Sequence, residues 1–238
     1  AAKENVLPKM KKKIGVLKGV LDLGGIDEEV KENTKKAIAF YESRGYEIVE
    51  IDIPLISYGI ATYYVIMPAE ASSNLARFDG VKYGLKVDGN NLLEDYLKTR
   101  REGFGAEVRR RIMLGTYVLS SGYHDAYYNK ALKVRDMLKA DFAKAFEKVD
   151  AILTPTAPTP AFKLGSKTND PIAMYLEDIF TVTANLTGTP AISIPSGFTS
   201  GEKSDGKKLP LGIQLTAPHL HEEVLFALGS EFEDNFSK

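Results

Sequence analysis

The feature that most restricts the fold is a strand–helix–strand pattern near the start of the chain. Residues 14–17 form a short apolar run, and residues 46–53 alternate polar and apolar side chains before Pro54 ends the run. Between these segments, apolar residues recur at helical spacing, with Asp27 placed as an N-cap and Gly45 as the residue after the helix. Two strands joined by one helix indicate a βαβ unit. We therefore expect an α/β fold with a mixed, mostly parallel sheet.

The rest of the chain continues the alternation of helices and strands. Helical spacing extends from about residue 57 to residue 148, interrupted near Gly80, Gly89 and residues 103–105. The proline-containing tract 154–160 can continue neither a sheet nor a helix, so we expect an ordered loop leaving a strand end. With no internal repeat and no evident linker, the sequence predicts one α/β domain. The other elements expected from these patterns are strands at 151–153, 191–195 and 212–216 and helices at about 172–186 and 222–232.

Composition excludes several functional classes. The 31 Lys and Arg residues balance 32 Asp and Glu residues, so no global positive field attracts nucleic acid or anionic lipid. The chain has no cysteine, which removes disulfides, thiolate catalysis and cysteine-based metal sites. It also has no stretch of about 18 apolar residues and no segment resembling a signal peptide. We expect a soluble, cytoplasmic protein that does not bind membranes.

Common catalytic and nucleotide-binding motifs are absent from the sequence. It contains no G-x-S-x-G, no G-x-x-x-x-G-K-[ST], no G-x-G-x-x-G and no H-E-x-x-H. The pair Gly24-Gly25 is better explained as a turn than as a phosphate-binding loop. Residues 11–13, three consecutive lysines, are interpreted as a solvated tail, with nucleic-acid contact as the alternative. They end a segment, residues 1–12, that we expect to be flexible before one folded region at 13–238.

A metal site is considered at one position and is not favoured. His219 and His221 are followed by Glu222 and Glu223, and imidazole and carboxylate groups are common metal ligands. These residues lie where a strand ends and a helix begins, and the sequence offers no obvious third ligand. His124 is the only other histidine, so the sequence has few histidines for a histidine-based catalytic triad or a three-histidine metal centre. We predict no metal in this chain.

Two charged positions are candidates for binding a substrate. Residues 109–111 are three consecutive arginines that precede the apolar run 112–114, and on a helix they cannot all face the same surface. A buried guanidinium needs a planar anion, and a carboxylate fits its geometry. Asp178 lies on an otherwise apolar segment. Taken alone, both patterns are more typical of surface charges. An Arg and an Asp facing one cavity would suit the carboxylate and ammonium of a free amino acid.

Several blocks of sequence together are typical of one family. They lie at 63–66, 70–80, 102–116, 120–128 and 154–158, and two further blocks lie at 185–195 and 211–214. The first five resemble the A subunits of glutamyl-tRNA(Gln) amidotransferases, and the last two are shared by amidase-signature enzymes generally. Within the first set, A-S-S-N-L at 71–75 and S-G-Y at 121–123 are specific to these subunits among amidases. The resemblance covers about residues 13–232.

The resemblance implies a fold, a reaction and three substrate contacts. The fold is the C-terminal half of the amidase-signature α/β/α sandwich, and the reaction is hydrolysis of L-glutamine to supply ammonia. The ammonia passes to a partner subunit that uses ATP and Mg²⁺ to activate Glu-tRNA(Gln) or Asp-tRNA(Asn). In the family, positions matching three residues here hold glutamine: Tyr63 in the pocket wall, Arg111 at the α-carboxylate and Asp178 at the α-ammonium. The loop 154–159 is expected to line the same cleft.

One departure from the family decides what the chain can do alone. Family members carry a Lys, a cis-Ser and a nucleophilic Ser in a Gly/Ser-rich signature that lies N-terminal to the blocks found here, and this sequence contains no such segment. Residues 120–122, Ser-Ser-Gly, resemble a small part of this signature but lack the glycine-rich flank that provides an oxyanion hole. We therefore assign no catalytic residue to this chain. It resembles the C-terminal half of the family's enzyme, whether from a natural split, a truncated gene or a trimmed protein.

The sequence therefore supports one principal interpretation and two alternatives. In the first, the chain is the glutamine-recognition half of an A subunit, inactive alone, with a separate N-terminal signature half as a partner. The alternatives are a non-catalytic module that docks other amidotransferase subunits, and half of an amidase with another amide substrate. Uncovered sheet edges and apolar faces would also favour self-association of the isolated chain.

Overall fold

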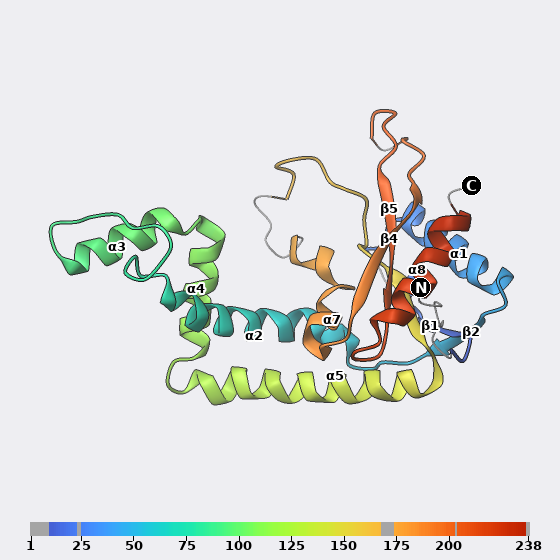
Figure 1. Cartoon of the computed structure of the whole chain (residues 1–238), viewed down its shortest axis with the longest axis horizontal. Helices are drawn as coiled ribbons and strands as arrows, with labels where there is room; N and C mark the ends of the chain where they lie inside the picture. Colours follow the sequence, from blue (N-terminus) through green and yellow to red (C-terminus); the bar gives the residue numbers. More distant parts are fainter. Residues whose placement is uncertain (1–9, 23–24, 168–173, 203, 237–238) are drawn as a thin grey trace, which may run out of the picture. The chain divides into compact units, whose positions relative to one another are not determined.

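The computed structural model describes residues 10–22, 25–167, 174–202 and 204–236, and the chain divides into two compact units (Figure 1). Unit 1 contains Ala1–Ile60 and Asp136–Lys238, and unit 2 contains Ala61–Arg135. Both boundaries fall inside helices, α2 (Gly59–Asn74) and α5 (Asn129–Lys148), so no linker joins the units. Residues 1–9 lie outside the described residues, and the division into a flexible 1–12 and a folded 13–238 stays a prediction.

A five-stranded mixed sheet forms the centre of unit 1. Neighbours β2–β1 and β1–β3 are parallel, whereas β3–β5 and β5–β4 are antiparallel. The predicted α/β fold with a mixed sheet is confirmed, although parallel pairs do not predominate. Strands β4 and β5 follow each other along the chain without a helix between them, and such consecutive strands can pair antiparallel because no crossover is needed. The strands are β1 (Lys13–Leu17), β2 (Glu47–Ile51), β3 (Ala151–Pro155), β4 (Ala191–Phe198) and β5 (Pro210–Thr216).

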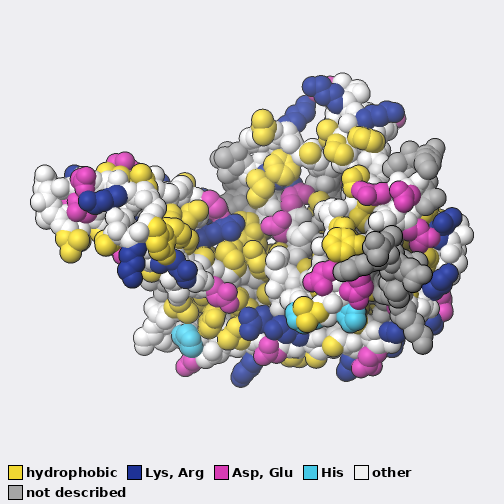
Figure 2. Space-filling model, in the orientation of Figure 1, with side chains coloured by type: hydrophobic (Ala, Val, Ile, Leu, Met, Phe, Trp, Pro, Cys, Tyr) yellow, Lys and Arg dark blue, Asp and Glu magenta, His cyan; other side chains and the backbone are white. Residues whose placement is uncertain are grey.

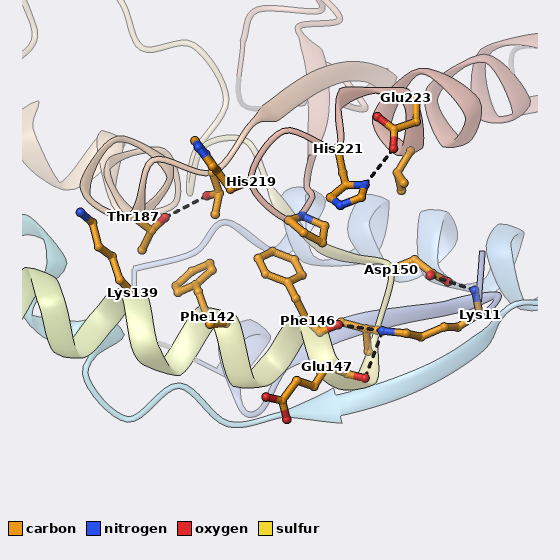
Figure 3. A pocket seen from close by; sticks show the side chains of 15 residues that line it. Lys11, Lys139, Phe142, Phe146, Glu147, Asp150, Thr187, His219, His221 and Glu223 are labelled. Atoms are coloured by element: carbon orange, nitrogen blue, oxygen red, sulfur yellow. Dashed lines mark hydrogen bonds and ion pairs between the residues drawn. The ribbon is translucent and has the colours of Figure 1, made fainter. Parts of the chain in front are cut away.

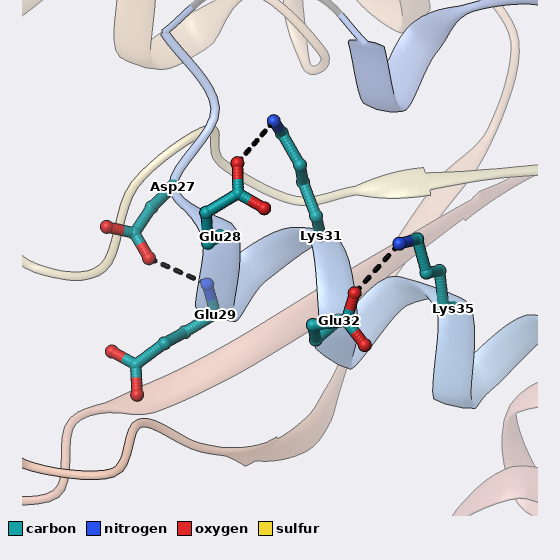
Figure 4. A network of polar contacts seen from close by, with 6 residues as sticks. All are labelled: Asp27, Glu28, Glu29, Lys31, Glu32 and Lys35. Carbon is teal, nitrogen blue, oxygen red and sulfur yellow. Dashed lines mark hydrogen bonds and ion pairs between the residues drawn. The ribbon is translucent and has the colours of Figure 1, made fainter.

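Helix α1 (Glu28–Ser43) connects β1 to β2 and has the ends that its sequence predicts. Asp27 caps the helix by accepting a hydrogen bond from the Glu29 backbone N–H at 2.8 Å (Figure 4). Ion pairs along the first turns join Glu28 to Lys31 and Glu32 to Lys35. At the other end, Gly45 has φ +86°, the left-handed conformation that glycine adopts after a helix. The predicted βαβ unit is confirmed.

One face of the sheet packs against α1 and α8 (Glu222–Phe236) through an apolar core. Tyr41 of α1 is fully buried, its ring stacks on Phe232 with centroids 5.7 Å apart, and its hydroxyl donates to the Leu228 carbonyl at 3.1 Å. The phenol therefore has a partner in an otherwise apolar core. The strands contribute the fully or nearly fully buried side chains Ile14, Leu153, Ile194, Ile213 and Leu215.

The segment before β4 differs from the single helix expected at about 172–186. Residues 168–173 lie outside the described part, and beyond them the chain forms a 3₁₀ turn η5 (Leu176–Asp178), a turn, and the short helix α7 (Val182–Thr187). Between η5 and α7, the Phe180 carbonyl accepts hydrogen bonds from the Gln214 side chain of β5 at 3.0 Å and from the Thr183 hydroxyl at 3.1 Å, so side chains satisfy this acceptor. Gly188, with φ +73°, then ends α7.

Lys11 and Lys13, which were expected to belong to a solvated tail, form hydrogen bonds with residues at the end of α5 and just after it. Both carboxylate oxygens of buried Asp150 accept backbone N–H groups, from Lys11 and from Lys13, each at 2.9 Å. The Lys11 ammonium also donates to the carbonyls of Phe146 and Glu147 at the end of α5, at 2.8 and 3.0 Å. A cation at the carboxyl end of a helix is favourable, because several carbonyls there have no partner in the helix. The solvated-tail interpretation is therefore wrong for Lys11 and Lys13.

We expect Asp150→Ala to lower the free energy of unfolding by about 2–3 kcal/mol, because it leaves two buried backbone donors without an acceptor. Asp150→Asn is the matched control, since its amide keeps one acceptor oxygen and should lose roughly half as much. Urea unfolding followed by circular dichroism measures both values. Equal stability of the alanine variant and the parent chain would contradict this account of how β1 begins.

Unit 2 is helical, as the spacing in residues 57–148 predicts. It contains α2 from Ala61 onward, α3 (Leu92–Gly103), α4 (Ala106–Val118), a π-helical turn η4 (His124–Tyr128) and the beginning of α5. Residues 78–91 are non-helical and are tied to α3, because the Val87 backbone N–H donates to the Thr99 hydroxyl at 2.9 Å. The predicted interruptions near Gly80, Gly89 and residues 103–105 are confirmed. Among the described residues, the 3₁₀ turn η3 (Leu75–Arg77) also belongs to unit 2, whereas η1 (Val20–Asp22) and η2 (Ile56–Tyr58) belong to unit 1.

Helices α2 and α4 approach each other closely at one glycine. A Cβ added to Gly115 of α4 would overlap the backbone carbonyl of Pro68 in α2. Real Cβ atoms essentially never come within 3.0 Å of another heavy atom, so only glycine fits between these helices.

Within the described part of the chain, the structure contains no helix with the length and apolar character needed to cross a bilayer.

Candidate functional site

A cavity of about 570 Å³ in unit 1 is lined by Asp178 and by part of the loop that the sequence indicates. It lies at the end of β3, where the chain passes through Pro155 into the predicted loop. Thr156 and Thr159 of this loop line the cavity, and so does Asp178. The loop and Asp178 therefore lie at one cavity, as expected. Asp178 lies in the 3₁₀ turn η5, in the segment where one continuous helix was expected.

The loop is held in place by backbone and side-chain hydrogen bonds. The Thr156 N–H donates to the Gly212 carbonyl at 3.1 Å, and the Pro158 carbonyl accepts the Asp27 N–H at 2.9 Å. The hydroxyls of Thr156 and Ser193 lie 2.8 Å apart. A Cβ on Gly212 would come within 3.0 Å of the Thr156 hydroxyl, so this glycine leaves room for the hydroxyl pair. The cavity wall is thus preorganised.

Beside Asp178, a second carboxylate is neutralised by the chain itself. Glu177 forms an ion pair with Lys167 and accepts hydrogen bonds from the Thr159 hydroxyl at 3.0 and 2.9 Å. Both members of the ion pair are largely buried, with the Glu177 and Lys167 side chains 16% and 21% exposed. This contact fixes η5 to the loop and so fixes the position of Asp178. Neither residue was predicted from the sequence, and only the proximity of Glu177 to Asp178 could have drawn attention to it.

Arg111 lies on α4 in unit 2, with a side chain that is 34% exposed. Its Nε donates to the Glu107 carboxylate one turn earlier at 2.9 Å, and one Nη lies 3.7 Å from the sulfur of Met67 on α2. Arg110 pairs with the same Glu107 but is more exposed, at 56%. Of these two arginines, Arg111 is therefore the one turned toward α2, as helical geometry requires of at least one of the three.

Tyr63 is near enough to Arg111 to influence the pKa of its guanidinium. Burial alone would lower the pKa of the Arg111 guanidinium, but the hydrogen bond and charge of Glu107 raise it, and the phenols of Tyr64 and Tyr63 add to the rise. The rings of Tyr63 and Tyr64 meet edge to face with centroids 5.3 Å apart. Tyr63 and Arg111 thus share a local environment in unit 2, whereas Asp178 belongs to unit 1.

A second cavity in unit 1, of about 630 Å³, contains the histidine pair (Figure 3). His219 donates through Nδ1 to the Gly188 carbonyl, and His221 through Nδ1 to the Glu223 carboxylate, both at 2.8 Å. Phe142 and Phe146 of α5 form its apolar wall. The two imidazoles therefore have partners within the fold. Among the described residues, no three His, Asp or Glu side chains come together as a metal site.

The turn predicted at Gly24-Gly25 is described only in part. Gly25 has φ +95°, the left-handed conformation that a glycine turn adopts, and Gly24 lies outside the described residues.

Comparison with known proteins places the chain in a family. The family model described as Amidase matches residues 2–226, nearly the whole sequence. The chain belongs to the amidase family. It is 55% identical over 223 residues to the A subunit of the glutamyl-tRNA(Gln) amidotransferase of Thermodesulfovibrio yellowstonii, and 53% identical over 223 residues to that of Pelagibacter ubique. The match covers 94% of this chain but only 45% and 44% of those relatives.

Solved structures agree with the fold of this member of the amidase family. The crystal structure of the glutamyl-tRNA(Gln) amidotransferase A subunit from Thermotoga maritima superposes with a TM-score of 0.69 at 38% identity, over 96% of this chain and 43% of that one. An allophanate hydrolase from Kluyveromyces lactis, at 22% identity, has a TM-score of 0.68, and the match covers 94% of this chain and 32% of that one. The latter shows the shared fold alone. The resemblance to part of an A subunit is confirmed, and the chain spans less than half the length of these relatives.

Proposed function

We propose that this chain provides the glutamine-recognition part of an amidotransferase A subunit. Relatives 50–55% identical to it are glutamyl-tRNA(Gln) amidotransferase A subunits, which supports this reaction over that of amidases in general. L-glutamine would be the ammonia donor. The acceptor, Glu-tRNA(Gln) or Asp-tRNA(Asn), would be bound and activated with ATP and Mg²⁺ by a partner subunit. The chain itself would need no cofactor, and its place would be the cytoplasm, in protein biosynthesis.

The observation that carries the proposal is a cavity that combines a carboxylate with hydroxyl groups. Asp178 supplies a negative charge for an α-ammonium, and Thr156 and Thr159 supply hydroxyls at the same cavity. The neighbouring carboxylate, Glu177, pairs with Lys167 and with the Thr159 hydroxyl. Arg111, with Tyr63 nearby, would take the α-carboxylate. A free amino acid is the ligand class that needs both charges.

The bond-breaking groups would come from a Gly/Ser-rich signature segment outside these 238 residues. Mixing this chain with a separately expressed signature segment of an A subunit should restore release of ammonia from glutamine, while each part alone should be inactive. Ammonia is measured with glutamate dehydrogenase. A reconstituted enzyme that ranks glutamine last among amides would indicate a different substrate, and an inactive mixture that still forms a stable complex would favour a docking module.

In the reconstituted enzyme, Asp178→Asn should raise KM for glutamine at least about tenfold, because the loss of one charge-assisted contact is worth about 1.5–3 kcal/mol. Asp205→Asn is the matched control, since this carboxylate is exposed and pairs with the exposed Lys163. Steady-state kinetics of ammonia release provides both values. The assignment of Asp178 would be wrong if the two variants behaved alike.

A further inference from the structure

Helix α3 in unit 2 exposes a stripe of large apolar side chains. Leu92, Leu93, Tyr96 and Leu97 are 77%, 66%, 39% and 56% exposed. Their helical positions fall within an arc of about 140°. Thr99, 4% exposed, lies beside the Leu92 edge of that arc, where its hydroxyl accepts a hydrogen bond from the Val87 backbone N–H. Monomeric proteins rarely leave several large apolar side chains together in water, so this stripe is a candidate interaction surface.

The stripe lies between two hollows. One, of about 490 Å³, has Val81, Leu92, Leu93 and Tyr96 as its apolar lining, and its polar lining consists of Asp79, Lys86, Asp95 and Thr99. The other, of about 280 Å³, lies between α3 and α4, and its apolar lining consists of Leu97, Phe104, Ile112 and Met113. Concave apolar surfaces on both sides of an apolar ridge receive protruding side chains of a partner better than they receive a flat surface.

Arginines surround the smaller hollow, and two of them have no acidic partner among the described residues. Arg100 is engaged by its own unit, since it donates to the Leu75 and Phe78 carbonyls at 3.0 and 3.2 Å. Arg101 and Arg109 are exposed, line the hollow and form no ion pair within the described part of the chain. Hydrophobic and basic side chains lie together over α3 and α4 in Figure 2. The surface therefore presents two positive charges beside apolar hollows.

We propose that this α3–α4 surface docks an acidic amphipathic segment of a partner protein. Apolar side chains of the partner would enter the two hollows, and its carboxylates would pair with Arg101 and Arg109. A uniformly anionic partner such as a nucleic acid or lipid surface fits less well, because α3 also carries Glu94, Asp95 and Glu102. The inference goes beyond glutamine binding and does not depend on it.

Photo-crosslinking from the surface tests this proposal. The full chain carries p-benzoylphenylalanine in place of Leu97, is purified with its bound partners, and its crosslinked peptides are sequenced. We expect a peptide from another protein that combines acidic and apolar residues. The yield should fall at least about tenfold in Arg101→Glu/Arg109→Glu, and should be retained in Arg101→Lys/Arg109→Lys and in Lys130→Glu, which alters an exposed lysine elsewhere in unit 2.

Crosslinks to lipid, to nucleic acid or to a second copy of this chain would each overturn the proposal. So would a yield no higher than that from the probe at Phe226, an exposed apolar residue of α8 in unit 1. A yield unaffected by the double charge reversal would have the same meaning, provided that circular dichroism shows the variant to be folded. Ammonia release by the reconstituted enzyme is measured separately, so failure of this surface is distinguishable from failure of the proposed function.

Discussion

Replacement of Gly115 by alanine should lower the free energy of unfolding by about 3 kcal/mol or more. Two effects oppose each other at this position. Alanine is favoured over glycine inside a helix by about 1 kcal/mol, which would stabilise α4. The new Cβ, however, would overlap the Pro68 carbonyl and lie 2.8 Å from the Ser72 hydroxyl, so α2 and α4 would have to separate. Backbone cannot move aside as a flexible side chain can, and the steric cost therefore exceeds the gain in helix propensity.

Gly103 provides the matched control for this substitution. It is the last residue of α3, and a Cβ there would meet only the Leu85 side chain at 3.6 Å, an ordinary van der Waals contact. Gly103→Ala should therefore change the stability by less than about 1 kcal/mol, toward higher stability if anything. Urea unfolding curves give both values. If Gly115→Ala were as stable as the parent chain, the close approach of α2 and α4 would be wrong.

Local patterns were sufficient to predict the elements of unit 1 whose environment is regular. The pattern in residues 46–53 identified β2, although burial does not alternate along it: Ile48 packs against the core shared with α1 and α8, and Ile51, on the other face, is 5% exposed. Asp27 and Gly45 identified the ends of α1, because capping depends on residues adjacent in sequence. The run at 151–153 identified β3, all of whose residues are buried. In each case, the determining contacts are within a few residues or follow a simple period.

The errors arose where a contact joins distant parts of the sequence. The segment expected as one helix at 172–186 divides into η5 and α7, and between them the Phe180 carbonyl accepts a hydrogen bond from Gln214, 34 residues away in sequence. Lys11 is fixed by Asp150, 139 residues later, and nothing in a run of lysines reveals such a partner. The candidate site shows the same division, since the loop 154–159 and Asp178 were found from the sequence. The ion pair of Glu177 with Lys167, which depends on the tertiary fold, was not.

Arg111→Ala should lower kcat/KM for glutamine at least about a hundredfold in the reconstituted enzyme. Two hydrogen bonds from a guanidinium to a carboxylate would be lost, each worth about 1.5–3 kcal/mol, and each 1.4 kcal/mol corresponds to about a factor of ten. Arg111→Lys should recover only part of the activity, because an ammonium cannot reproduce the planar two-point contact. Steady-state measurement of ammonia release compares the three proteins.

Arg110→Ala is the control that separates substrate binding from a general role of charge on α4. Arg110 is the adjacent residue, carries the same charge and pairs with the same Glu107, but its side chain is 56% exposed compared with 34% for Arg111. Its removal should change kcat/KM less than about twofold, since an exposed ion pair within a helix contributes little. Equal losses from both substitutions would mean that Glu107, and not the substrate, is the partner for which Arg111 matters. A loss confined to Arg111 would mean that its orientation toward α2 serves the ligand.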